Sequence, residues 1–256
     1  MNKHTAINVL FAVSLVCLFF LHLSHPVAWY WYALLVLLYM SISAAGSYFI
    51  GLNYFLHSYN KGSNKKPQIA ITFDDGPNEY TPAILDILQK EKATATFFCI
   101  GQNIAGRENI LTRANMEGHL IGNHSFNHLH SFPIQMPNAI ASEIGQCNEQ
   151  ISHAIGKTPR LFRPPFGVTD PMVARGLYMT GMYSIGWSLR SYDTVVKDPQ
   201  KLLAKVSRVS AGDIVLFHEA GLHTPAILSQ FIQNARAKGL EIVPLDRLLD
   251  IDAYEK

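Results

Sequence analysis

The sequence predicts an α/β domain with a mostly parallel sheet, preceded by a hairpin of two membrane-spanning helices. After residue 66, short apolar segments alternate with segments of helical spacing, which favours parallel strands joined by right-handed helical crossovers. Before that point, the stretch from Thr5 to Asn60 contains no Asp, Glu, Lys or Arg, so its surface requires lipid. For residues 67–256, a closed or partly open β/α barrel is the expected architecture, and a doubly wound sheet is the alternative.

The N-terminal residues 1–59 are predicted to be a membrane anchor. His25-Pro26 divides them into two apolar stretches, residues 7–23 and 27–55, and a membrane-spanning helix needs roughly 17–25 such residues. The aromatic cluster at residues 29–32 is typical of a membrane interface. Such a hairpin places both ends of the chain on one side of the membrane. The alternative is that the first stretch is the core of a signal peptide, although no small-x-small cleavage site follows it.

Residues 60–66 are polar and contain glycine, and we interpret them as a linker to a separate domain over residues 67–256. Lysines flank the hairpin at its two chain ends, which by the positive-inside rule favours a cytoplasmic domain. Of the 21 Lys and Arg residues only Lys3 precedes the hairpin, which leaves 20 against 19 Asp and Glu. This near-balance gives no electrostatic case for binding nucleic acid.

The elements expected in the domain follow from periodicity and from turn residues. Strands are predicted at Gln68–Phe73, Thr94–Ile100, His119–Gly122, Met182–Trp187, Asp213–Phe217 and Leu240–Val243. Helices are predicted at Ala83–Lys90, Met136–Ile155, Pro171–Thr180, 199–210 and 225–238. Three of them begin with a cap residue followed by proline, at Thr81-Pro82, Asp198-Pro199 and Thr224-Pro225. Functional side chains are then expected on the loops that follow the strands.

Two such loops carry candidate metal ligands. Asp74 and Asp75 come directly after the first strand, and successive residues leaving a strand point in different directions. One carboxylate is therefore expected to face a ligand that the other does not touch. His124 and His128 follow the third strand four residues apart and can meet one metal ion. With one carboxylate they form a two-His, one-carboxylate site with open positions, and His119 and His130 are nearby alternatives.

Other loops carry further candidates. Arg163-Pro164-Pro165-Phe166-Gly167 has a rigid backbone, so its arginine can be aimed at a carboxylate of the site. Trp187 ends a strand, and Asp193 follows six residues later. His218 ends another apolar strand, in a position that suits a general acid or base.

Together these segments resemble the polysaccharide deacetylases, which are carbohydrate esterase family 4 and carry the nodulation-protein-B homology domain. The motifs that carry the resemblance are Thr72–Pro77, His124–His128, Arg163–Gly167, Trp187–Asp193 and Leu216–His218, within roughly Pro67 to Leu249. The resemblance implies a distorted (β/α) barrel and a divalent metal, usually zinc. It also implies hydrolysis of the N-acetyl group of N-acetylglucosamine-type sugars.

The resemblance also implies a role for each matching residue. The implied metal ligands are Asp75, His124 and His128. Asp74 resembles the general base, Arg163 the arginine that holds it, His218 the general acid and Asp193 the carboxylate that tunes that acid. Pro165, Phe166 and Trp187 are implied in substrate binding, with the Phe166 N–H as an oxyanion donor.

The chain departs from the family pattern in the wall of the implied sugar pocket. Phe166 stands where many members have Tyr, Thr194 where a Trp commonly follows the motif Asp, and Arg190 where an acid is frequent. The expected partners are an N-acetylated glycan and the membrane. The alternatives are a same-fold hydrolase of a non-sugar amide and a non-catalytic glycan-binding membrane protein. The lysines that flank the hairpin favour a cytoplasmic location for the domain, whereas polymeric glycan substrates favour the outside of the membrane. We expect an extracytoplasmic domain.

Overall fold

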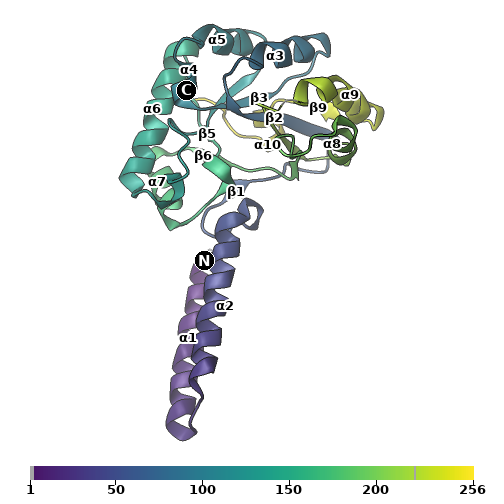
Figure 1. Ribbon diagram of the computed structural model, residues 1–256. Coiled ribbons are helices and arrows are strands. Elements are labelled where there is room, and N and C mark those ends of the chain that lie inside the picture. Colours follow the sequence, from purple (N-terminus) through teal and green to yellow (C-terminus); the bar gives the residue numbers. More distant parts are fainter. Residues whose placement is uncertain (1–2, 222) are drawn as a thin grey trace.

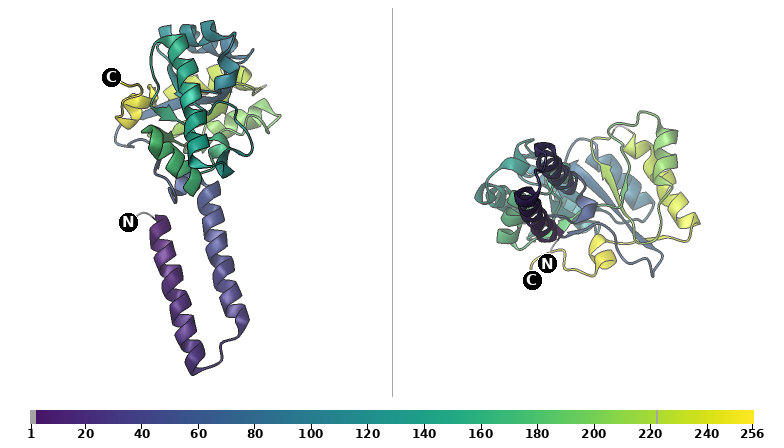
Figure 2. Two further views of the ribbon diagram at one scale, coloured as in Figure 1. Left: turned by 90° about the vertical axis from the view of Figure 1, so that its left-hand side faces the viewer. Right: turned by 90° about the horizontal axis from the view of Figure 1, so that it is seen from below.

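The computed structural model describes residues 3–221 and 223–256, which form a helical hairpin projecting from an α/β domain (Figure 1). The hairpin consists of α1 (Lys3–Ser24) and α2 (Trp29–Tyr48), which run side by side with their connecting turn farthest from the domain (Figure 2). Both helices are long and apolar enough to cross a membrane. Within these two helices Gly46 is the single buried residue, so their apolar side chains face outward.

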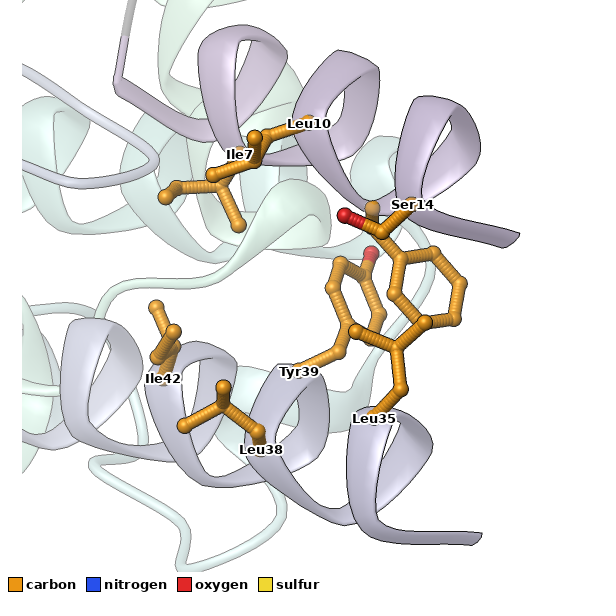
Figure 3. Close-up of a pocket in the computed structure, with 8 residues that line it drawn as sticks. Ile7, Leu10, Ser14, Leu35, Leu38, Tyr39 and Ile42 are labelled. Atoms are coloured by element: carbon orange, nitrogen blue, oxygen red, sulfur yellow. The ribbon is translucent and has the colours of Figure 1, made fainter. Parts of the chain in front are cut away.

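The two helices contact each other through apolar side chains and hydrogen bonds, one of them from the Tyr32 hydroxyl to the carbonyl oxygen of Leu18 at 3.0 Å. Tyr39 donates a hydrogen bond from its hydroxyl to Oδ1 of Asn8 at 2.9 Å, and its ring stacks on Phe11 with 4.4 Å between centroids. Beside this contact lies a hollow of about 150 Å³ between the helices (Figure 3). It is lined by Ile7, Leu10, Phe11, Ser14, Leu35, Leu38, Tyr39 and Ile42.

The second helix ends at Tyr48 rather than near residue 55, because the chain beyond it packs on the α/β domain. A short 3₁₀ helix, η1 (Ile50–Leu52), follows, and Ile50 and Tyr54 are both buried. Strand β1 (Ser58–Tyr59), which precedes the predicted linker, pairs with β6 and extends the sheet. The segment that follows α2 is therefore a structural part of the domain.

The sheet is parallel throughout, in the order β1-β6-β5-β4-β3-β2-β8-β7, with β9 pairing the start of β2. Its remaining strands are β2 (Gln68–Gly76), β3 (Thr96–Cys99), β4 (Leu120–Asn123), β5 (Leu161–Phe162), β6 (Tyr183–Ile185), β7 (Leu189–Arg190), β8 (Ile214–His218) and β9 (Glu241–Ile242).

The connection from β6 to β7 forces the sheet to curl. These strands lie near opposite edges of the sheet order, yet only residues 186–188 join them. Four residue steps span at most about 14 Å, so the two edges must approach each other. The result is a partly open, distorted β/α barrel, which confirms the predicted fold class over the doubly wound alternative.

Helices surround this curled sheet, with α6 and α7 at the left of the view and α8 and α9 at the right (Figure 1). The α-helices are α3 (Thr81–Lys90), α4 (Gly101–Ile104), α5 (Glu108–Met116), α6 (Pro137–Ile155), α7 (Pro171–Thr180), α8 (Pro199–Val206), α9 (Thr224–Ala237) and α10 (Leu245–Leu249), with 3₁₀ turns η2 (Phe132–Ile134) and η3 (Pro165–Gly167). At the centre of the core the Phe73 ring stacks between Phe97 and Phe217, with centroids 5.2 and 5.7 Å away. All five predicted helices are present, and α8 is shorter than expected.

Two of the three predicted helix caps have a different function in the structure. Asp198 caps α8 as predicted, accepting hydrogen bonds from the N–H groups of residues 200 and 201. Thr81 and Thr224 instead are the first helical residues, and their hydroxyls donate to the buried carboxyls of Glu219 and Asp193. Both threonines therefore link the start of a helix to a buried carboxyl group.

Candidate functional site

The end of β2 carries both aspartates into one pocket. Asp74 lies opposite Phe98 of β3 and Gly76 lies opposite Cys99, so Asp75 is the extra residue of a β-bulge. Its backbone has a φ of 72°, in the left-handed region, and such bulges re-aim side chains next to active sites. Asp74 and Asp75 both line the pocket, whereas a regular strand would separate them. Asp75 then lies with His124 and His128 in the candidate metal cluster, whereas Asp74 is bound by Arg163.

Asp75, His124 and His128 form a cluster with the geometry of a metal site. The Oδ1 atom of Asp75 lies 3.5 Å from Nε2 of each histidine, and the candidate ligand atoms all lie within 4.8 Å of one another. His124 Nδ1 is 2.7 Å from the carbonyl oxygen of Arg163, so Nδ1 donates and Nε2 faces Asp75. Among the described residues this is the one group of three such side chains that could share an ion.

The protonation preferences of two of these groups suit metal binding. Burial, reinforced by the charge of His124, lowers the pKa of His128 to about 4, which leaves its imidazole neutral at pH 7. Burial would raise the pKa of Asp75, but a hydrogen bond with His124 and nearby histidine charges outweigh it and hold that pKa well below its usual range. An ionised carboxylate beside a neutral imidazole is the donor chemistry that a divalent ion requires.

The two alternative histidines lie outside this cluster. His119 is buried and its Nδ1 accepts a hydrogen bond from the N–H of Ala95 at 3.2 Å. His130 stacks on the ring of Phe166, with 4.9 Å between centroids, at the rim of the pocket.

Arg163 is fully buried and binds Asp74 from behind the pocket. Its Nη1 donates to Oδ1 of Asp74 at 2.7 Å and to Oγ1 of Thr72 at 2.8 Å. Its other nitrogens donate to the carbonyl oxygens of Ile185 and Gly186. A buried charge needs this complete set of partners, and together they fix the Asp74 carboxylate at the pocket wall.

His218 faces Asp74 from the neighbouring strand and has its own carboxylate partner. In the β2–β8 pairing His218 lies opposite Asp74, and its Nδ1 is 2.8 Å from Oδ1 of Asp193. The other oxygen of Asp193 accepts from the His218 backbone N–H at 2.7 Å and from the Thr224 hydroxyl at 2.6 Å. Burial would lower the pKa of His218, but the hydrogen bond to Asp193 and the nearby carboxylates outweigh it and raise that pKa. The protonated imidazole is thereby favoured.

The remaining wall of the pocket is formed by Phe166, Gly167, Trp187, Arg190 and Leu216. Phe166 has a φ of 59° and is 41% exposed, so its ring stands at the mouth. Pro165 is buried and does not contribute to the pocket lining, unlike the sequence-based expectation. Gly167 and Leu216 also line the pocket, although the sequence motifs that contain them predicted no role for either residue. Glycine is required at residue 167 because a β-carbon there would collide with the Trp187 ring.

Comparison with known proteins identifies the family. The family model for polysaccharide deacetylase matches residues 61–185. The peptidoglycan-N-acetylmuramic acid deacetylase of Bacillus subtilis is 30% identical over 207 residues, covering 77% of this chain and 78% of that protein. A peptidoglycan-N-acetylglucosamine deacetylase of Bacillus cereus is 33% identical over 196 residues, covering 73% of this chain and 90% of that protein. The chain belongs to the polysaccharide deacetylase family.

Solved structures of polysaccharide deacetylases share the fold. The crystal structure of a peptidoglycan N-acetylglucosamine deacetylase is 26% identical with a TM-score of 0.71, covering 77% of this chain and 94% of that one. A structure described as a carbohydrate esterase family 4 pseudoenzyme from Bacillus anthracis is 27% identical with a TM-score of 0.70, covering 75% and 68%. The resemblance inferred from the motifs is confirmed for the family, the fold and the enzyme class.

Proposed function

We propose that this polysaccharide deacetylase is a membrane-anchored, metal-dependent enzyme that removes N-acetyl groups from N-acetylglucosamine-containing glycans. One observation carries the proposal: the Asp75, His124 and His128 cluster lies between an arginine-bound Asp74 and a carboxylate-bound His218. The two relatives named above are described as deacetylases of N-acetylated peptidoglycan sugars, which supports a glycan substrate.

The donor set of the cluster fits zinc. Two imidazole nitrogens and one carboxylate oxygen are typical ligands of catalytic zinc, and they leave positions open for water and substrate. When bound there, a divalent ion supplies Lewis acidity, which lowers the pKa of water and polarises an acetyl carbonyl. Asp75, His124 and His128 are therefore assigned as the ligands.

Two residues divide the proton transfers. Asp74, held by Arg163, accepts the proton of the attacking water as general base. His218, held protonated by Asp193, donates a proton to the sugar nitrogen, so that the nitrogen leaves as an amine. Negative charge developing on the carbonyl oxygen is met by the backbone N–H of Phe166, whose loop is fixed by hydrogen bonds from Gly167 and Val168.

The sugar is expected to lie against the aromatic wall of the pocket. Phe166 and Trp187 present apolar ring surface beside the metal cluster, which suits the face of a pyranose ring. Pro165 contributes by fixing the backbone of this loop, since its own side chain is buried.

The hairpin is proposed to be an uncleaved anchor, with the catalytic domain on the extracytoplasmic side. Ser47 of α2 exchanges two hydrogen bonds with Thr169 of the catalytic domain, at 2.8 and 3.0 Å, so helix and domain form one structure. Reporter fusions at residue 2 and after Lys256 are expected to report the same compartment. Opposite compartments would show a single span or a cleaved signal.

The test is acetate release by the purified full-length protein from a panel of N-acetylated glycans, with and without a chelator. Asp74→Asn keeps the side-chain shape and is expected to lower the rate about 10²–10⁴-fold while metal stays bound. Wild-type acetate release by this variant would refute the assignment. Release from a non-sugar amide alone would favour the same-fold amidohydrolase, and glycan binding without release would favour the binding protein.

A further inference from the structure

Arg190 lines the catalytic pocket but takes part in none of the steps above. It lies on β7 opposite Leu216 of β8, and His218, two residues after Leu216, lies opposite Asp74 of β2. Side chains alternate along a strand, so Arg190, Leu216 and His218 project from the same face of the curled sheet. The half-buried Arg190 therefore reaches the same pocket as the acid–base residues, which its place in the pocket lining confirms.

The guanidinium of Arg190 is positioned by two aromatic rings. Its central carbon lies 5.7 Å from the Trp187 ring centroid and 5.0 Å from that of Tyr192. Its Nε is buried without a hydrogen-bond acceptor, and within residues 3–221 and 223–256 no carboxylate lies at ion-pair distance from it. A guanidinium offers five donors, and a buried donor such as Nε is costly to leave unpaired unless a ligand uses it.

The acidic groups in and beside the pocket already have partners other than Arg190. Asp74 is paired with Arg163, Asp193 with His218, and Asp75 with the two cluster histidines. A second cation, Lys205, lies with its Nζ 3.8 Å from the ring centroid of Tyr192 and adds to the positive potential on this side. Once a divalent ion occupies the cluster, the charges around the sugar site sum to a net positive value.

We propose that Arg190 binds an oxyanion carried on or beside the N-acetylated sugar, so that the enzyme prefers acidic over neutral glycans. The inference rests on the proposed function and adds its substrate class. A guanidinium already oriented by two rings loses little freedom on binding, and its fork matches the two oxygens of a carboxylate or phosphate. Those two groups share the required chemistry, and the experiment separates them.

The experiment compares three glycans of equal length: a neutral N-acetylglucosamine oligomer, the same oligomer with one carboxylate, and the same oligomer with one phosphate. Full-length wild type is expected to show a higher kcat/KM for at least one of the acidic glycans. A charge-assisted hydrogen bond contributes about 1.5–3 kcal/mol, so Arg190→Gln should lower the acidic-to-neutral ratio about 10- to 100-fold. Arg190→Lys keeps the charge without the fork and should recover part of that ratio.

Two further measurements make the outcome decisive. Lys205→Gln removes a cation that is near Tyr192 but outside the pocket lining, so it should lower the ratio much less than Arg190→Gln does. Calorimetric binding of the same glycans does not depend on catalysis, so it tests Arg190 even where no acetate is released. Equal binding of acidic and neutral glycans, or an equal loss for both in Arg190→Gln, would overturn the inference. Absence of acetate release with an intact anion preference would instead refute the proposed function.

Discussion

Replacing Asp193 by Asn tests whether His218 works as the general acid. Asp193 Oδ1 is 2.8 Å from Nδ1 of His218, and hydrogen bonds to charged groups contribute about 1.5–3 kcal/mol. One pKa unit corresponds to about 1.36 kcal/mol, so losing the carboxylate should lower the pKa of His218 by about one to two units. An amide at residue 193 can still accept from the His218 backbone N–H, so the loop is expected to keep its position.

The sign of the effect follows from the role of the acid. His218 donates a proton only while protonated, so activity is lost as pH rises through its pKa, which the native surroundings raise. In Asp193→Asn the alkaline limb of kcat/KM for acetate release should therefore move about one to two pH units lower. Asp213→Asn is the matched control, because Asp213 is another buried carboxylate with serine partners, outside the pocket lining. A lower rate at all pH values with an unmoved alkaline limb would refute the reasoning.

Three other predictions concern the metal, the buried ion pair and stability. His124→Ala and His128→Ala should each lose bound metal with the fold intact, and stoichiometric metal in the double variant, by elemental analysis, would exclude both. Arg163→Gln leaves Asp74 buried without a charged partner, so the free energy of unfolding by denaturant should fall by about 3–5 kcal/mol, and a loss under about 1 kcal/mol would contradict this. Burial lowers the pKa of His119 from 6.5 to about 4, so stability should decline by up to about 3 kcal/mol as pH falls between those values. His119→Gln should remove this part of the decline and leave the part due to His128, whose pKa is also lowered to about 4; an unchanged pH dependence would refute the contribution of His119.

The long elements and the polar motifs could be predicted from the sequence because each carries a local signal. The apolar run at Gln68–Phe73 and the spacing over Met136–Ile155 each exceed one full period of their structure, and both became β2 and α6. Since parallel strands end at one edge of a sheet, the residues following them were expected together, and the structure brings Asp74, His124 and His218 into one pocket.

The remaining features depend on contacts that a sequence does not display. Strands β1, β5 and β7 have two residues each, too few to show alternation, and they exist because neighbouring strands pair with them. The bulge at Asp75 is defined only by its register against β3. Thr224 has the local sequence of a helix cap, but the carboxylate of Asp193, far away in sequence, accepts its hydroxyl instead.

In the proposed membrane-anchored enzyme, the hydrogen bonds between Ser47 and Thr169 would fix the distance between the domain and the bilayer. The 20 residues of α2, at about 1.5 Å each, match the ~30 Å hydrocarbon core of a membrane, and Ser47 is next to the last of them. With α2 across the bilayer as proposed, Thr169 would lie level with the lipid headgroups, and Gly167 of the pocket wall is only two residues, about 7 Å of chain, away. An enzyme anchored in this way would reach only those glycan segments that lie at the membrane surface.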